Sequence, residues 1–109
     1  MTDRVTISVN EGVADVRLNR PDKMNALDPA MFDGIVEAIV RLGAMREVRC
    51  VVMSGEGRAF CAGLDMASMA AGGSGLDIAK RSWGPANKVQ QVSWGWRTLP
   101  MPVIAAVHG

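Results

Sequence analysis

A short run of β-branched residues and the glycine-rich loop after it limit the folds open to this chain of 109 residues. Residues 48–54 (Val-Arg-Cys-Val-Val-Met-Ser) are typical of a buried strand. Gly55 and Gly57 follow, and glycine lets the backbone take positive φ values where the strand ends. Ala62 and Gly63 leave the next bend almost bare of side chains, so a ligand could approach its peptide N–H groups closely. Open α/β sheets bind ligands at such carboxyl ends of strands.

The residues before this strand predict a β-hairpin and one amphipathic helix. Residues 4–10 and 14–18 alternate apolar and polar, and Asn-Glu-Gly between them is typical of a hairpin turn. Asp28 and Pro29 predict a helix start, because Asp favours the N-cap and Pro the first helical position. We expect Arg46 in its last turns, where a cation suits the helix dipole. Its predicted apolar stripe comprises Phe32, Ile35, Val36, Ile39 and Val40.

Beyond the loop, a helix and one more strand are predicted. Residues 70–75 (Ala-Ala-Gly-Gly-Ser-Gly) show no pattern and predict a mobile segment, and a helical turn is expected near residues 76–81. A helix is expected over residues 86–97, and a short strand over residues 103–107. The predicted fold class is therefore α/β, in which a hairpin precedes parallel strands linked by helices.

Composition and spacing argue against several other classes of protein. The net charge of +1 gives no reason to expect a nucleic acid or an anionic membrane as partner. No apolar run approaches the roughly 20 residues that span a bilayer, and the N-terminus leads directly into a strand pattern without a signal peptide. Cys50, Cys61 and His108 lack the paired spacing of a metal site. The phosphate-loop and dinucleotide motifs are absent, with Phe60 where the latter needs glycine. We expect a reduced, cytoplasmic protein without a metal.

Three segments resemble the crotonase (enoyl-CoA hydratase/isomerase) superfamily and occur in its order. Residues 55–66 are similar to the first oxyanion-hole segment, and residues 19–27 (Asn-Arg-Pro-Asp-Lys-Met-Asn-Ala-Leu) to the segment that contacts coenzyme A. Residues 100–109 resemble the strand that leads into the second oxyanion segment. The resemblance implies that residues 1–109 form the N-terminal half of a crotonase (ββα-spiral) domain, incomplete at its C-terminus.

The resemblance also implies a binding site. The backbone N–H of Ala62 is expected to donate to the thioester oxygen of an acyl-CoA and to stabilise the enolate that forms there. Without the resemblance, the loop reads as a plain strand-exit turn. Asp65 is also a candidate N-cap for a short helix over residues 66–70. The residues expected to contact substrate or coenzyme A are Lys23, Met24, Ala26, Ala62, Gly63, Leu64 and Asp65.

Two interpretations stay open for the cations near this site. Arg20 and Lys23 could meet the phosphates of coenzyme A at the rim of a cleft, since both side chains bind phosphate. For Arg20 the alternative is a solvated loop charge. Arg58 is either a second phosphate contact or a shield for the loop.

The apolar candidates also carry alternatives. Met66 and Met69 suit either an acyl pocket or plain core, because flexible Met side chains fill irregular apolar space. Trp83 and Trp94 could shape the same pocket, whereas Trp96 is predicted to pack in the core with Val89 and Val92. By resemblance, His108 is structural rather than catalytic.

The implied activity of the complete protein is hydration of a 2-enoyl-CoA, without a cofactor other than the coenzyme A of the substrate. Members of the family use two glutamates for this; these and the second oxyanion donor lie beyond the point that matches Gly109, so this chain alone is expected to be inactive. Isomerisation and the other crotonase reactions share the enolate and remain alternatives. Others are a truncated, non-catalytic acyl-CoA-binding module and an unrelated small α/β protein. Complete members form homotrimers or hexamers, which we expect here for the complete protein.

Overall fold

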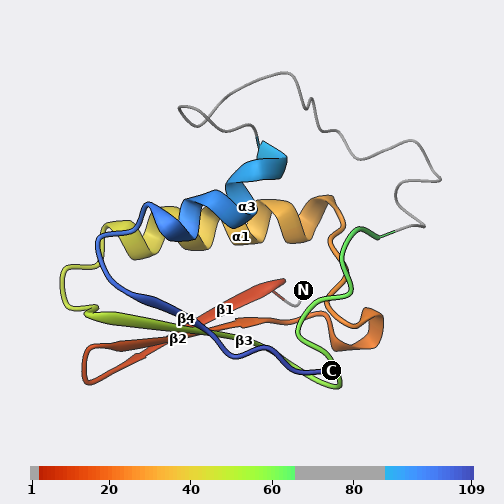
Figure 1. Cartoon of the computed structure of the whole chain (residues 1–109), viewed down its shortest axis with the longest axis horizontal. Coiled ribbons are helices and arrows are strands. Elements are labelled where there is room, and N and C mark those ends of the chain that lie inside the picture. Colours follow the sequence, from red (N-terminus) through yellow and green to blue (C-terminus); the bar gives the residue numbers. More distant parts are fainter. Residues whose placement is uncertain (1–2, 66–87) are drawn as a thin grey trace.

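A computed structural model of the chain describes residues 3–65 and 88–109, which form one four-stranded sheet with helices α1 and α3 on one face (Figure 1). The sheet order is β1-β2-β3-β4. The predicted helix over 66–70, the segment 70–75 and the helical turn near 76–81 lie outside the described residues, as do Met66, Met69 and Trp83.

The predicted hairpin is confirmed. Strands β1 (Val5–Asn10) and β2 (Val13–Leu18) pair antiparallel across a two-residue turn. Glu11 and Gly12 have φ values of 51° and 83° in that turn, as a tight hairpin requires. The buried face of β2 consists of Ala14, Val16 and Leu18.

Helix α1 (Pro29–Gly43) begins where the sequence predicts, but two details of the prediction are wrong. Asp28 caps it, and its Oδ1 accepts a hydrogen bond of 2.8 Å from the Met31 amide. Val40 is 53% exposed because it lies one step beyond the stripe that faces the sheet. Arg46 lies past the last turn, in which the basic residue is instead Arg41. The buried stripe comprises Met31, Phe32, Ile35, Val36, Ala38, Ile39 and Leu42.

The parallel part of the sheet follows the hairpin. Strand β3 (Cys50–Gly55) lies parallel to β2, and β4 (Val103–Ala105) lies parallel to β3. Strand β3 begins two residues later than predicted, and β4 ends two residues earlier. The chain therefore has the predicted α/β architecture, a hairpin followed by parallel strands, with α1 as the crossover from β2 to β3.

Helix α3 (Lys88–Arg97) completes the core by packing on α1. The prediction that Trp96 is a core residue is confirmed: it is 8% exposed, and its Nε1 donates 2.8 Å to the carbonyl of Val92. Trp94 is 42% exposed, with the guanidinium carbon of Arg97 5.8 Å from its ring centroid. No helix within residues 3–65 and 88–109 is long and apolar enough to cross a membrane.

Candidate functional site

Two segments leave the same edge of the sheet, because β2 and β3 are parallel and end side by side. The crossover segment, residues 19–28, follows β2, and the candidate loop, residues 56–65, follows β3 (Figure 1). Gly57 has the expected positive φ, at 87°, but Gly55 does not. A Cβ at Gly55 would lie 2.5 Å from the Phe60 carbonyl oxygen and 2.7 Å from Asn25 Nδ2. Close approach, rather than backbone dihedral, therefore requires glycine at position 55.

Three backbone hydrogen bonds lay the end of the candidate loop along the crossover segment. The Ala62 amide donates to the Met24 carbonyl over 3.0 Å. The Leu27 amide donates to the Gly63 carbonyl over 2.7 Å, and the Leu27 carbonyl accepts from the Asp65 amide over 3.0 Å. The last two bonds form a parallel bridge between Leu27 and Leu64.

This bridge sets the direction of the Leu64 amide. In a parallel bridge, one residue bonds through its own N–H and C=O to the two neighbours of the other, whose own N–H and C=O point the opposite way; here Leu27 makes both bonds, to Gly63 and Asp65. Leu64 therefore turns its amide away from the crossover segment, and the residue is 49% exposed. Beside it, Gly63 has a φ of 90°, and a Cβ there would meet no described atom within 4 Å. No described atom crowds the loop at Gly63, next to the Leu64 amide.

The two amides immediately before that of Leu64 are engaged. Ala62 donates to Met24, as above, and the Gly63 amide lies 3.4 Å from the Cys61 sulfur. Of these three amides, only that of Leu64 lacks an acceptor among the described residues. A thioester oxygen at the Ala62 amide would have to compete with the Met24 carbonyl.

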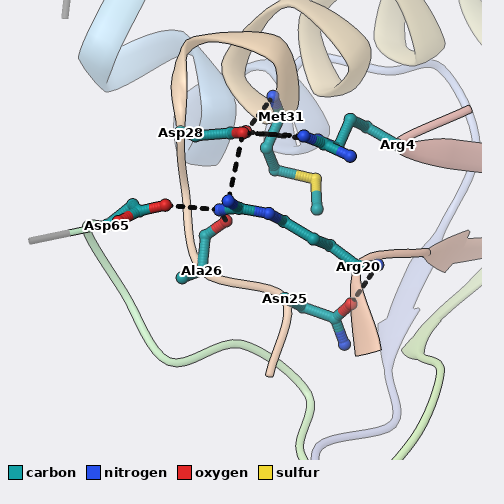
Figure 2. A network of polar contacts seen from close by, with 7 residues as sticks. All are labelled: Arg4, Arg20, Asn25, Ala26, Asp28, Met31 and Asp65. Atoms are coloured by element: carbon teal, nitrogen blue, oxygen red, sulfur yellow. Dashed lines mark hydrogen bonds and ion pairs between the residues drawn. The ribbon is translucent and has the colours of Figure 1, made fainter. Parts of the chain in front are cut away.

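The interpretation of Arg20 as a solvated loop charge is wrong, since its side chain is only 13% exposed and is bound by acidic partners (Figure 2). Its Nη1 donates 2.6 Å to Asp65 Oδ2 and 3.2 Å to the Ala26 carbonyl. Its Nη2 lies 3.5 Å from Asp28 Oδ2. The guanidinium is neither a solvated loop charge nor turned out toward a phosphate.

Asp28 lies between the guanidinium groups of Arg20 and Arg4. Arg4 Nη2 donates 2.9 Å to Asp28 Oδ2, and Arg4 Nε donates 3.3 Å to Oδ1. Burial alone would raise the pKa of Asp28, but hydrogen bonds from Arg4 and the Met31 amide, with the nearby charge of Arg20, lower the pKa below its ordinary value. The hydrogen bond to Asp28 in turn raises the pKa of Arg4. Both side chains are therefore charged at neutral pH.

Three of the predicted contacts, Lys23, Met24 and Ala26, lie on the crossover segment. Lys23 ends a 3-10 turn (Pro21–Lys23), and both Lys23 and Met24 are exposed. Ala26 is half-buried, and its carbonyl accepts from Arg20. Arg58 is exposed on the candidate loop. Lys23 and Arg58 thus keep their cations at the surface, unlike Arg20.

Asn25 is a site residue that the sequence analysis missed. It is fully buried at 0% exposure, with a φ of 57°. Its Oδ1 accepts 2.7 Å from the Arg20 amide, and its Nδ2 donates to the carbonyls of Glu56 (3.0 Å) and Ala59 (2.9 Å). One side chain thus fastens the crossover segment to the candidate loop. The available signal was that Asn tolerates a left-handed backbone better than most residues.

His108 has structural contacts, as predicted. Its Nε2 lies 3.0 Å from the Gly57 carbonyl oxygen, and its own carbonyl accepts 2.9 Å from the Phe60 amide. The segment after β4 therefore supports the start of the candidate loop. Within residues 3–65 and 88–109, no three His, Cys, Asp or Glu side chains gather as a set that could hold a metal ion.

A family model described as enoyl-CoA hydratase/isomerase matches residues 8–109, so the chain belongs to that family. The fold is accordingly the N-terminal part of the crotonase fold that the sequence resemblance implied. A crystal structure of an enoyl-CoA hydratase from Mycobacterium avium subsp. paratuberculosis K-10 superimposes with a TM-score of 0.75 at 26% identity, covering 100% of this chain and 40% of that one.

Two curated relatives match along nearly the whole chain. A probable enoyl-CoA hydratase of Rhodobacter capsulatus is 36% identical over 96% of this chain and 38% of its own. The mitochondrial Delta(3,5)-Delta(2,4)-dienoyl-CoA isomerase of Homo sapiens is 37% identical over 97% of this chain and 34% of its own. The chain thus spans little more than a third of these two relatives.

Proposed function

We propose that the complete protein containing this chain adds water to a 2-enoyl-CoA, and that residues 1–109 are the N-terminal half of its crotonase domain. Family membership and the relative named as a hydratase support the reaction class. The orientation of the Leu64 amide is the observation that carries the site assignment. It offers a backbone donor, turned away from the crossover segment, at the carboxyl end of a parallel strand, where α/β sheets bind ligands.

The oxyanion donor in this proposal is the Leu64 amide rather than that of Ala62. As a thioester becomes an enolate its oxygen gains negative charge, and a donor fixed in advance stabilises it by about 2.7–4 kcal/mol. The bonds that Gly63 and Asp65 make to Leu27 fix the Leu64 peptide from both sides. The Ala62 amide then has a supporting role, because its bond to Met24 sets the path of the loop.

The remaining predicted contacts keep their place in the proposal. Exposed Lys23 offers its ammonium to a phosphate of coenzyme A, and exposed Met24 offers apolar surface beside it. Ala26 and Gly63 leave room for the acyl-CoA, and Asp65 acts through Arg20. Coenzyme A, as part of the substrate, is the only cofactor proposed. A cytoplasmic homotrimer or hexamer is the proposed form of the complete protein.

Double-bond isomerisation is the second candidate, favoured by the 37% identity to the human dienoyl-CoA isomerase. It uses the same enolate and the same donor. A truncated acyl-CoA-binding module without catalysis stays a third candidate.

Turnover of crotonyl-CoA by the complete protein, followed at the enoyl absorbance, tests this function. Leu64→Pro deletes the proposed donor and should lower kcat by about 10²–10³-fold, whereas Leu64→Ala keeps the amide and should retain turnover. Ala62→Pro distinguishes an oxyanion donor at Ala62 from one at Leu64, because it removes the Ala62 amide and its bond to Met24 but keeps the Leu64 amide. Wild-type turnover by a folded Leu64→Pro protein would overturn the Leu64 assignment, and isomer formation without hydration would favour the second candidate.

A further inference from the structure

Four charged side chains from distant parts of the sequence meet beside the candidate loop (Figure 2). Arg4 bonds to Asp28, which lies within 3.5 Å of Arg20, and Arg20 bonds to Asp65 over 2.6 Å. The side chains of Arg20, Asp28 and Asp65 are 13%, 10% and 11% exposed. Removing one member of such a shielded ion pair leaves the other charge uncompensated, which the surrounding structure must then relieve by moving.

The network reaches the candidate loop at Asp65, the residue after Leu64. Asp65 is held twice, by its amide on the Leu27 carbonyl and by its carboxylate on Arg20. Arg20 is itself held firmly: its amide donates to Asn25 Oδ1 over 2.7 Å, and its guanidinium also bonds to the Ala26 carbonyl. The Asp65 carboxylate therefore sits against a cation that is fixed to the crossover segment.

We propose that Arg20 is a positioning residue which, through its ion pair with Asp65, holds the Leu64 amide in the direction that an oxyanion requires. The inference rests on the proposed function for its catalytic meaning. A donor works only where the developing charge will be, and a displacement of about 1 Å from that point can cost about 10²-fold in rate. Arg20 acts on the reaction through Asp65 and does not touch the substrate.

The geometry favours this role over a direct contact with coenzyme A. A phosphate needs an accessible guanidinium edge, whereas the Arg20 side chain is 13% exposed and both Nη atoms face carboxylates. Lys23 is exposed on the crossover segment and Arg58 on the candidate loop, so these two side chains are available to bind a phosphate instead. The loss of Arg20 should accordingly lower kcat rather than raise KM.

The test compares kcat and KM for crotonyl-CoA in complete proteins carrying Arg20→Gln, Arg20→Lys or Asp65→Asn. Arg20→Gln and Asp65→Asn should each lower kcat by about 10–100-fold with KM within about threefold. The double variant should lose no more than either single one, because the two residues act as a pair. Arg20→Lys keeps the charge and should recover part of the rate.

Arg17→Gln is the matched control. Arg17 also pairs with two carboxylates, Asp15 and Glu56, but its side chain is 47% exposed. The loss of Arg17 should therefore leave kcat unchanged.

Amide hydrogen exchange without substrate gives a readout that does not depend on turnover. Arg20→Gln and Asp65→Asn should speed exchange at the Ala62 and Asp65 amides while leaving the amides of β2 and β3 protected. Unchanged exchange in the loop, a raised KM at constant kcat, or additive losses in the double variant would each overturn the positioning role. If Arg20→Gln does not fold, the nearly isosteric Asp65→Asn decides by the same criteria. If the wild-type protein turns over no acyl-CoA, the proposed function fails; the exchange result then decides whether Arg20 holds the loop.

Discussion

At the scale of single residues, the Asn25 side chain holds the crossover segment against the candidate loop. Its side chain bonds to the Arg20 amide and to the carbonyls of Glu56 and Ala59, with no exposed surface. A buried polar group that loses its partner costs about 1–3 kcal/mol. Three groups lose their partner at once when this amide is removed.

Asn25→Ala should therefore lower the free energy of unfolding of the complete protein by more than about 2 kcal/mol, from the orphaned groups together with the strain of alanine at a φ of 57°. Urea unfolding of the variant measures this. Asn25→Gly relieves the backbone strain but not the lost bonds, so it should recover only part of the loss. A fully recovered stability in Asn25→Gly would show that the side-chain bonds contribute nothing.

The same residues show what the sequence could predict. The turns at Gly57 and Gly63, where φ is 87° and 90°, follow from the local sequence, because glycine favours positive φ. The approach of the Asn25 side chain to Gly55 and the burial of Arg20 do not follow, because these partners lie far along the chain: Arg20 and Asp65 are 45 residues apart. The sequence analysis places the donor at Ala62, whereas the proposal places it at Leu64, because the bridge to Leu27 turns the Leu64 amide away from the crossover segment.

At the scale of elements, helix α1 was predicted well at its start because the signals there are local. Asp28 and Pro29 act within one turn of the chain. Which residues of the stripe become buried depends on the sheet and on α3, so the sequence misplaces Val40. Arg46 is misplaced for another reason, because the helix ends at Gly43. The sequence places strand β3 within two residues, because a β-branched run followed by glycine is typical of a buried strand.

The cap of α1 predicts a dependence of stability on pH. The pKa of Asp28 is lower in the folded chain than in the unfolded one, so its charge stabilises the fold above the unfolded pKa of about 3.9. This contribution is lost as the pH falls through the lower, folded pKa. Asp28→Asn keeps an N-cap acceptor but removes the charge that Arg4 and Arg20 face.

Chemical unfolding from pH 7 to pH 2 should therefore show wild type more stable than Asp28→Asn at neutral pH, with the difference shrinking below about pH 4. Asp28→Ala also removes the cap acceptor and should lose about 0.5–2 kcal/mol more at every pH. A difference between wild type and Asp28→Asn that widens in acid would contradict the sign of the pKa shift.

At the scale of the whole molecule, the described chain exposes apolar surface at one edge of the sheet. Strand β4 ends the strand order, and near this edge Ile104 is 55% exposed and Val107 is 70% exposed. An edge strand of this kind presents unpaired N–H and C=O groups beside apolar side chains, which favours pairing with another chain. In the proposed complete protein, the residues that follow would cover it.

Ile104→Lys should therefore improve the behaviour of the isolated polypeptide but destabilise the complete protein. In the isolated polypeptide of residues 1–109, Ile104→Lys should reduce self-association, because edge lysines discourage strand pairing; light scattering across micromolar concentrations measures this. In the complete protein the same change should lower the melting temperature, because a charge would then be buried without a partner. Val40→Lys is the matched control, since Val40 is 53% exposed and lies on a helix rather than on an edge strand, so it should change neither quantity. A monomeric wild-type polypeptide at all concentrations, or an Ile104→Lys complete protein as stable as wild type, would mean that this edge is not where the rest of the domain packs.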